Sequence, residues 1–280
     1  MKRPPHRGAR SSQARPVPAG NPRSSAPRQP VVKPTRREIK YHGWHACLAL
    51  WQQRPADVIR IYLTENRLKG AAKLLSWAAS NRLAYHVVDD AELERVTETH
   101  HHQGICVLAY EHPRTPFQTF VGDASESDRC LGVYLDGLGN PHNTGAILRT
   151  LAFFGVRYVL GDGVNRINLA PSTCRVAEGG AEFVKIVDLE TPTRQLELLK
   201  KRGFVLATSD VKKGHSLARY TFPPRTILIL GNEESGVTPA IAQLADAVLR
   251  IEGGGNVESL NVSAAAALFV STYFRQHPAG

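Results

Sequence analysis

The chain has 280 residues, a mass of 30.7 kDa and a formal net charge of +10. A single small domain is excluded, because this length provides for one large or two medium domains that each bury a core. Ten of the 35 Lys and Arg residues and none of the 25 Asp and Glu residues lie within residues 1–37, so the rest of the chain is neutral overall. The basic excess is therefore a property of the amino-terminal segment.

Residues 1–37 are predicted to form a disordered basic tail, because they contain eight prolines and almost no large apolar side chains. Such a segment has two interpretations. It can act as an electrostatic arm that attracts phosphates at long range, with an affinity that falls as salt rises. It can equally be a solubilising extension without a dedicated partner. The composition leaves both interpretations open.

The same segment bears on the cellular localisation of the protein. A secretory signal is excluded because no apolar stretch follows the positively charged start, and no run approaches the length of a membrane span. An organelle transit peptide stays open, since the start is rich in Arg and Ser and free of acids, although its prolines oppose an amphipathic helix. We expect a cytoplasmic protein without a membrane partner. The four cysteines form no C-x-x-C pair, so neither a disulfide framework nor a metal site is expected.

Residues 38–110 are predicted to form a small α/β domain. In chain order, the hydrophobic pattern predicts a helix from Ile39, a strand over 57–63, a helix over 68–80, a strand over 84–88, a short helix from Asp89 and a strand over 105–109. Its basic side chains are candidate contacts to phosphates: Arg54, Arg60, Arg67 and Lys69.

Residues 111–128 show little periodicity and are predicted to be a linker, and residues 129–280 form a larger domain. Its predicted strands cover 131–138, 157–161, 204–209, 226–233 and 247–253, and its predicted helices cover 143–154, 192–202, 239–245 and 260–275. Short apolar strands that alternate with helices indicate a parallel sheet covered on both faces. Ligands bind such sheets at the loops that leave the carboxyl ends of the strands.

Three of these loops carry distinctive residues: LDGLGNPHNTGAILRTLAFFG (135–155), ILILGNEESGVTP (227–239) and GGGNVESLNVSAAAALFV (253–270). Each also has a plain structural explanation. Asn143 can cap a helix and Arg149 can lie on its solvated face, Glu233 can cap the helix that follows it, and Ser259 can cap an alanine-rich core helix. Considered singly, each loop is therefore a weak signal.

Together and in this order, the three loops resemble the motifs of the SpoU (TrmH-like) RNA ribose methyltransferases of the SPOUT superfamily. The first loop matches the pattern Asn-x-x-x-x-x-Arg, and the second matches Gly-x-Glu-x-x-Gly. The matching residues are Asn143 and Arg149 in the first loop, Gly231, Glu233 and Gly236 in the second, and Ser259, Leu260, Asn261, Val262 and Ser263 in the third. The resemblance covers residues 129–280 closely. It extends more loosely to residues 38–110, which look like the family's small substrate-binding domain of ribosomal-protein L30e type.

The resemblance implies an α/β fold with a mostly parallel sheet and a carboxyl-terminal trefoil knot, preceded by the L30e-like domain. In this family the knot holds S-adenosylmethionine, the expected cofactor. The residues implied in cofactor binding are Leu230, Gly231, Asn232, Gly236, Ile251, Gly253, Gly255, Leu260 and Asn261. This chain departs from its relatives in two places: Glu252 and Gly253 stand where Pro and Met are common, and Glu234 stands where a second glycine is common.

The resemblance further implies transfer of a methyl group to a ribose 2′-hydroxyl of rRNA or tRNA, and not to DNA, which lacks that hydroxyl. Arg149 is the implied central catalytic residue. A guanidinium is always protonated, so it is better suited to clamp a phosphate and stabilise negative charge than to act as a base. The residues implied to hold Arg149 and the ribose are Asn143, Glu233, Ser259 and Asn261. The family also implies a homodimer.

Other functional classes fit less well. A dinucleotide-binding G-x-G-x-x-G fingerprint is missing, because Glu258 replaces its third glycine, and no Gly-Lys-Ser or Gly-Lys-Thr of a phosphate-binding loop is present. The consecutive residues His100, His101 and His102 are expected to form a polar loop and not a metal site. The alternative that stays open is an RNA-binding protein with a SPOUT fold that lacks methyl transfer.

Overall fold

The structure is a computed structural model that describes residue 1 and residues 36–278. The predicted basic tail lies almost wholly outside the described residues, so its disorder stays a prediction. Residues 36–278 belong to one compact unit. Arg36, assigned to the tail by composition, belongs to this unit, since its guanidinium binds the carboxylate of Asp57 with one contact at 2.8 Å.

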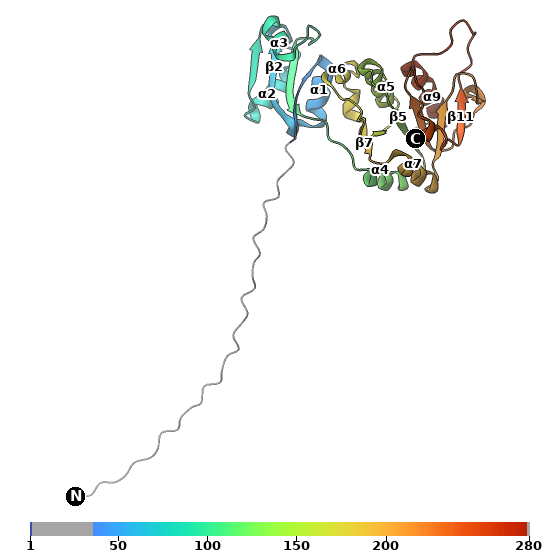
Figure 1. Ribbon diagram of the computed structural model, residues 1–280. Coiled ribbons are helices and arrows are strands. Elements are labelled where there is room, and N and C mark those ends of the chain that lie inside the picture. Colours follow the sequence, from blue (N-terminus) through green and yellow to red (C-terminus); the bar gives the residue numbers. More distant parts are fainter. Residues whose placement is uncertain (2–35, 279–280) are drawn as a thin grey trace. The chain divides into compact units, whose positions relative to one another are not determined.

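The first part of the compact unit is an α/β domain built on a four-stranded sheet with the order β1-β4-β2-β3 (Figure 1). Strand β4 is antiparallel to β1 and to β2, whereas β2 and β3 are parallel. The strands are β1 (Glu38–His42), β2 (Val58–Thr64), β3 (Tyr85–Val88) and β4 (Ile105–Tyr110). The helices are α1 (Trp44–Gln53), α2 (Ala72–Ser80) and α3 (Asp90–Thr97), with short 3₁₀ turns at Pro55–Asp57 and Glu65–Arg67.

The predicted helix from Ile39 is wrong in its first residues, which form strand β1. The strand ends at His42, and the φ of +96° at Gly43 turns the chain before α1 begins. A side chain at Gly43 would also meet Arg175 Cγ at 2.8 Å. A strand of five residues directly before a helix gives too little alternation to separate the two elements from sequence.

The second part is a seven-stranded sheet whose strand pairs are all parallel, in the order β7-β6-β5-β10-β8-β11-β9. The strands are β5 (Cys130–Asp136), β6 (Tyr158–Asp162), β7 (Lys185–Leu189), β8 (Val205–Ser209), β9 (His215–Ser216), β10 (Arg225–Gly231) and β11 (Ala247–Arg250). The helices are α4 (Phe117–Ser125), α5 (Pro141–Phe153), α6 (Pro171–Val176), α7 (Pro192–Lys201), α8 (Pro239–Ala242) and α9 (Val262–Gln276), with 3₁₀ turns at Gly180–Phe183 and Leu217–Arg219.

The segment 111–128 is more than a linker, because it contains helix α4. Phe117, Phe120, Val121 and Ala124 are buried and recur at helical spacing. They join a core cluster of the larger sheet, in which Phe120 packs against Phe204 with ring centroids 6.0 Å apart. The short length of the helix and the polar residues that follow it hid this pattern in the sequence.

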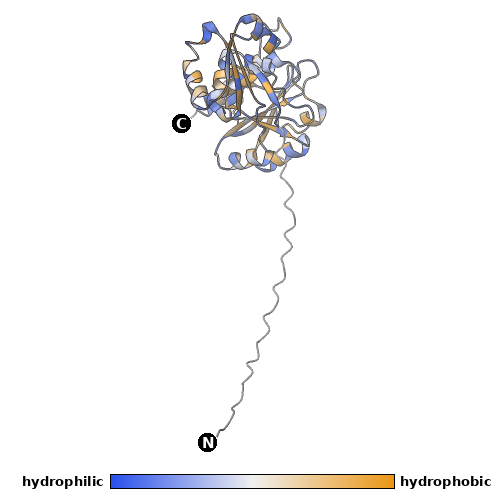
Figure 2. Cartoon of the chain, turned by 90° about the vertical axis from the view of Figure 1, so that its left-hand side faces the viewer, coloured by the Kyte–Doolittle hydropathy of each residue, from blue (hydrophilic) through white to orange (hydrophobic). Residues whose placement is uncertain are grey.

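The sequence prediction also missed both edges of the larger sheet. Strand β7 pairs with β6 along five residues, and the two-residue strand β9 pairs with β11 at the opposite edge. Ile186 and Val187 are fully buried, because the sheet is covered on both faces. Figure 2 shows the same pattern, with hydrophobic residues concentrated on strands and with helices that carry both hydrophobic and hydrophilic positions.

The strand order reverses between β5 and β10, and this reversal defines where a ligand can enter. From β5 the chain builds outward through β6 and β7, whereas β8, β10 and β11 lie on the other side. The carboxyl ends of β5 and β10 therefore flank the crevice in which sheets of this type bind ligands.

The carboxyl-terminal helix α9 is held by the segment between β8 and β10. Gln276 hydrogen-bonds the backbone of Phe222 and of Tyr220 at 2.8 Å each, and the Tyr273 hydroxyl donates to the carbonyl of Pro224 at 2.5 Å. The α/β fold with a parallel sheet is confirmed. The trefoil knot stays a prediction.

The two sheets share one hydrophobic core, which includes Leu50 and Val107 of the first part and Leu148 and Ala181 of the second. A bidentate ion pair crosses the same boundary. Arg54 Nε lies 2.8 Å from Glu182 Oε2, and these side chains are only 11% and 5% exposed. Arg54 is therefore not available as a phosphate contact, and that part of the sequence prediction is wrong.

Candidate active site

The first and second motif loops are fastened to each other at the carboxyl ends of β5 and β10. Asp136, the buried last residue of β5, accepts a hydrogen bond from the backbone N–H of Thr238 at 2.6 Å. The side-chain amide of Asn232 donates to the carbonyl of Gly137 at 3.0 Å. Asp136 and Gly137 were not among the predicted site residues, although an acid at the carboxyl end of a parallel strand is a signal that could have found Asp136.

The second loop is a tight turn over residues 231–237. Asn232 and Gly236 exchange backbone hydrogen bonds of 3.0 and 2.9 Å, and the Asn232 side-chain oxygen accepts from the backbone of Glu234 and Ser235. A Cβ on Gly231 would lie 2.3 Å from the carbonyl carbon of Gly236. Glycine at this position is therefore required by the close approach of two backbone segments.

The first and third motifs meet through two asparagines. Asn143 is buried in the first turn of α5, and its side-chain oxygen accepts a hydrogen bond of 3.0 Å from the side-chain amide of Asn261. Asn261 also caps α9, since its oxygen accepts from the backbone N–H of Ser263 at 2.9 Å. One residue therefore fixes the start of α9 and joins it to α5.

The structure corrects the plain capping explanations. Asn140, and not Asn143, caps α5 by accepting from the backbone N–H of His142 at 2.9 Å. Asn261, and not Ser259, caps α9. Asn143 thus lies within helix α5, and its side chain hydrogen-bonds Asn261 of the third motif. It is therefore not a helix cap.

The third loop, residues 251–261, is exposed apart from its partly buried first residue, Ile251, which packs against the core. A Cβ added at Gly253 or Gly255 would meet no other atom within 4 Å, so the backbone at these positions is open to solvent. Two apolar side chains lie beside this open backbone: Val257, 75% exposed, and Leu260, 48% exposed. Exposed apolar side chains beside open backbone leave both accessible to a ligand.

The third loop is tied to the segment that follows β8. Ser216 donates to Glu252 at 2.7 Å, and Lys212 pairs with Glu258 at 2.9 Å. The hydrogen bond from Ser216 and the charge of Arg250 lower the pKa of Glu252, and Lys212 lowers the pKa of Glu258. Glu252 thus contributes to the anchoring of the loop.

The remaining predicted catalytic residues are not brought together within this chain. Arg149 is exposed on α5, Glu233 is exposed in the second loop, and Ser259 is exposed in the third. Among the residues that the structure describes, none of these three side chains has a hydrogen bond or an ion pair. Arg149 lies six residues beyond Asn143 on one helix, so the two side chains leave it in different directions. Leu230, by contrast, is fully buried at the end of β10.

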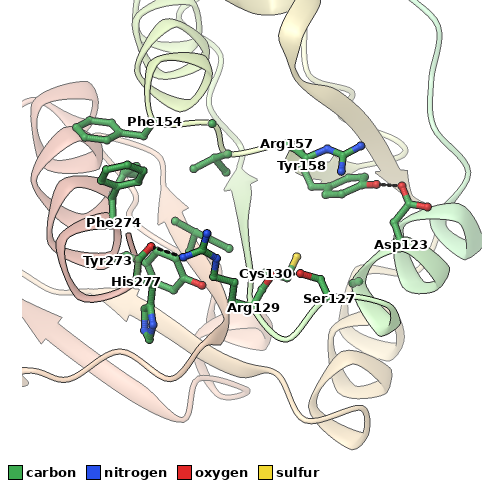
Figure 3. A pocket seen from close by; sticks show the side chains of 15 residues that line it. Asp123, Ser127, Arg129, Cys130, Phe154, Arg157, Tyr158, Tyr273, Phe274 and His277 are labelled. Carbon is green, nitrogen blue, oxygen red and sulfur yellow. Dashed lines mark hydrogen bonds between the residues drawn. The ribbon is translucent and has the colours of Figure 1, made fainter. Parts of the chain in front are cut away.

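A cavity of about 210 Å³ lies at the other end of the larger sheet (Figure 3). It is lined by the first residues of β5 and β6, Cys130 and Tyr158, and by the ends of α5 and α9. Figure 3 shows Phe154 beside Phe274, and Arg129 directed toward the end of α9, where it donates to the carbonyl of His277 at 3.0 Å. This cavity lies at the amino ends of the strands, so it is not part of the site formed by the motif loops.

Two features are absent from the residues that the structure describes. Within residues 36–278, no group of three or more His, Cys, Asp or Glu side chains is arranged to hold a metal ion. In the same part of the chain, no helix has both the length and the hydrophobicity needed to cross a lipid bilayer.

Comparisons with known proteins agree with this geometry. The sequence profile of the SpoU rRNA Methylase family matches residues 130–271, and the profile described as RNA 2′-O ribose methyltransferase substrate binding matches residues 42–113. The chain therefore belongs to the SpoU rRNA methylase family, and it carries the substrate-binding domain found in ribose methyltransferases. This confirms the resemblance inferred from the three motifs.

Individual relatives show how far the similarity extends. An uncharacterised tRNA/rRNA methyltransferase of Escherichia coli, YfiF, is 34% identical over 242 residues, which cover 86% of this chain and 69% of the relative. The 23S rRNA (guanosine-2′-O-)-methyltransferase RlmB of Bordetella pertussis is 30% identical over 84% of this chain and 96% of the relative. The SpoU methyltransferase AviRb of Streptomyces viridochromogenes, solved with AdoMet, has the same fold at a TM-score of 0.71 and 20% identity, covering 87% and 92% of the two chains.

Proposed function

We propose that this chain transfers the methyl group of S-adenosylmethionine to a ribose 2′-hydroxyl of rRNA or tRNA. The observation that carries the proposal is the hydrogen bond between Asn143 and Asn261, because it joins the first and third family motifs at the edge of the sheet where ligands bind. Family membership and the named activities of the relatives support the reaction. The named activities of the relatives favour methyl transfer over the non-catalytic RNA-binding alternative.

The residues of the second and third loops fit the cofactor. The open backbone at Gly253 and Gly255 leaves room for a ligand to approach the peptide groups, and the exposed Leu260 offers an apolar contact. The residues that would hold S-adenosylmethionine are Leu230, Gly231, Asn232, Gly236, Ile251, Gly253, Gly255, Leu260 and Asn261. When bound, the cofactor supplies an electrophilic methyl group on its sulfonium.

The chain's own task is to make a ribose hydroxyl reactive. A 2′-hydroxyl is a weak nucleophile, so it must be aligned with the methyl group, and the negative charge that develops on its oxygen must be stabilised. The guanidinium of Arg149 is suited to bind the adjacent phosphate and to lower the cost of that charge. Asn143, Glu233, Ser259 and Asn261 would orient the ribose and Arg149.

We further propose that two copies of the chain form the complete site. Within one chain Arg149 leaves α5 away from Asn143, and the exposed side chains near it include Phe153, 82% exposed. Helix α9 presents a similar surface, with Leu268 44% exposed. A homodimer that pairs α5 and α9 would cover these apolar side chains and bring Arg149 of one copy to the motif loops of the other. A light-scattering mass near 30.7 kDa at micromolar concentration would contradict this arrangement.

The proposed reaction takes place in the cytoplasm, where rRNA and tRNA are available. The basic residues of the tail are suited to increase the rate of encounter with RNA.

The decisive experiment has two steps. Isothermal titration with S-adenosylmethionine and S-adenosylhomocysteine should show micromolar binding that Asn261→Ala abolishes. Transfer of a labelled methyl group to rRNA or tRNA should then require Arg149, with Arg149→Lys strongly impaired because a lysine cannot bind a phosphate through two parallel hydrogen bonds. Absence of cofactor binding to the folded wild-type protein would reject the proposed function. Near wild-type turnover of Arg149→Lys would reject only the role given to Arg149.

A further inference from the structure

The sheet of the small domain has one face that is only partly covered. Tyr41, Ile61 and Val107 point to the face that joins the common hydrophobic core. Helix α3 contacts β1, β2 and β4, and its Leu93 is fully buried but lies outside that core, so α3 covers part of the opposite face. The rest of the opposite face is open to solvent.

Five side chains make up this open area, which we call the sheet platform. Strand pairing places Lys40 and Arg60 on either side of Leu108, and it places Tyr62 opposite His86. Successive residues of a strand point to opposite faces, so these five side chains share one face. Lys40, Arg60 and His86 are exposed, and Tyr62 and Leu108 are half-buried.

The aromatic part of the platform is preorganised. The rings of Tyr62 and His86 are stacked, with centroids 5.2 Å apart and an angle of 20° between their planes. Arg60 donates a long hydrogen bond of 3.4 Å to the Tyr62 hydroxyl, so a cation lies at the edge of the pair. Two nearly parallel rings on a rigid sheet, with a cation beside them, form a surface on which a flat nucleobase can stack.

Two cations and two acids surround the platform, and neither cation is held in a buried ion pair. Arg60 and Lys40 supply two positive charges. The acids close to them are Glu38, on the same strand as Lys40, and Glu98, which lies 3.9 Å from Lys40 in a pair whose side chains are 51% and 83% exposed. An exposed ion pair of this kind contributes little, so an RNA phosphate can displace Glu98 from Lys40.

We propose that the sheet platform binds an unpaired nucleotide of the substrate RNA. The base stacks on the Tyr62 and His86 rings, and Arg60 and Lys40 bind the flanking phosphates. Because duplex RNA keeps its bases stacked inside the helix, the platform selects loops, bulges or single strands. This inference rests on the proposed RNA substrate and adds to it which structural class of RNA is recognised and by which residues.

The test measures the binding of a labelled single-stranded oligouridylate of about 12 nucleotides to the full-length protein by fluorescence anisotropy. Tyr62→Ala and His86→Ala should each weaken binding at least about fivefold, which is the lower end of the loss of one base stack. Tyr62→Phe should bind like the wild type, because it keeps the ring. The matched control is Tyr85→Ala, since Tyr85 is 44% exposed on the same strand as His86 but faces the other side of the sheet.

The salt dependence of RNA affinity tests the charged part of the platform. Arg60→Ala should reduce the slope of log affinity against log salt by about 0.7, the value for one phosphate contact to a single strand. Lys73→Ala is the control, because Lys73 is exposed on α2, away from the platform. All variants keep the basic tail, so its contribution is common to them. Thermal melting near that of the wild type shows that each variant is folded.

The outcomes separate this inference from the proposed function. Equal loss in Tyr62→Ala and Tyr85→Ala, or no loss in either, overturns the platform, and the exposed face is then left for a protein partner. Equal binding of the oligouridylate and of a fully paired duplex also overturns it. Cofactor titration is independent of the platform: selective loss of RNA binding in Tyr62→Ala supports the platform even if S-adenosylmethionine does not bind, in which case only the proposed function fails.

Discussion

The side-chain amide of Asn261 donates a hydrogen bond of 3.0 Å to the side-chain oxygen of Asn143, across 118 positions of sequence. Asn143 is buried in α5 and Asn261 starts α9, so this bond sets the position of the third motif loop relative to the first helix after β5. A contact between two side chains of the family motifs is the strongest sign that the three loops act as one site.

The first prediction concerns both roles of Asn261. Asn261→Ala removes the cap of α9 and the bond to Asn143, so the free energy of unfolding should fall by about 1–2 kcal/mol in urea denaturation. Asn261→Ser is the matched variant, because serine can cap the helix but is too short to reach Asn143. We expect both variants to lose cofactor binding while Asn261→Ser keeps most of the stability. Cofactor affinity retained in Asn261→Ser would show that only the cap matters.

Two glycines of the site should respond in opposite ways to the same substitution. Gly231→Ala forces a methyl group to within 2.3 Å of the Gly236 backbone, so it should destabilise the fold by about 1–3 kcal/mol. Gly253→Ala meets no atom within 4 Å and should change stability by less than about 0.5 kcal/mol. If S-adenosylmethionine approaches the open backbone, calorimetry of Gly253→Ala should nevertheless show weaker binding. Unchanged affinity would remove Gly253 from the proposed cofactor site.

Breaking the buried ion pair between Arg54 and Glu182 should destabilise the fold far more than breaking an exposed ion pair would. Arg54→Ala leaves the Glu182 carboxylate buried without its partner, so the free energy of unfolding should fall by about 3–5 kcal/mol. Arg60→Ala, on the exposed sheet platform, is the control and should change it by less than about 0.5 kcal/mol.

A double variant tests the reason for this loss. Replacing Arg54 and Glu182 together by leucines removes both charges, and we expect it to recover part of the stability lost in Arg54→Ala. If the double variant is less stable than Arg54→Ala, the attraction within the pair stabilises the fold. The loss in Arg54→Ala is then not caused by the buried, unpaired carboxylate of Glu182.

Stability should decrease as pH falls from 6.5 toward 4 because of His42. Burial, with smaller contributions from the nearby Arg175, His102 and His101, lowers the pKa of His42 from 6.5 to about 4. Within this window the unfolded chain binds a proton that the folded protein excludes, so protonation favours unfolding. His42→Gln should flatten the pH dependence of the melting temperature below about pH 6.5. His215→Gln, at an exposed position, is the control and should leave the wild-type dependence in place.

Deletion of residues 2–35 tests the basic tail. This segment contains eight Lys and Arg residues and no acid, so its removal should weaken RNA binding and reduce the salt dependence of affinity. Arg36 must be kept, because it binds Asp57 in the compact unit. The deletion should leave cofactor affinity unchanged. An unaltered RNA affinity and salt slope would favour the solubilising interpretation.

The larger domain could be predicted well because its strands, helices and motifs are each recognisable within a short stretch of sequence. Alternation of short apolar strands and helices indicated the parallel sheet, and Asn143, Gly231 and Asn261 each stand in a recognisable motif at the end of a strand. The pattern correctly placed these motifs at one edge of the sheet, although the distribution of Arg149, Glu233 and Ser259 around a complete site stays a prediction.

What the sequence did not predict depends on contacts between distant residues or on very short elements. Arg54 looks like a surface cation until its partner Glu182, 128 positions away, is known. Strand β1 has five residues and strand β9 has two, too few for periodicity to identify. Asn140 and Asn143 are both good caps by type, and only the geometry of the turn selects Asn140. The sheet platform was missed for the same reason, since it joins side chains of four different strands.

The Arg54–Glu182 pair also helps to fix the distance between the small sheet and the larger sheet. The pair and the shared core join the small sheet to the larger one, so the sheet platform and the edge that carries Asn143 belong to one compact unit. An RNA bound at both places must present an unpaired nucleotide and a target ribose at one particular separation. Under the two proposals above, the target would be selected by the distance between two features of a folded RNA, with little need to read the sequence between them.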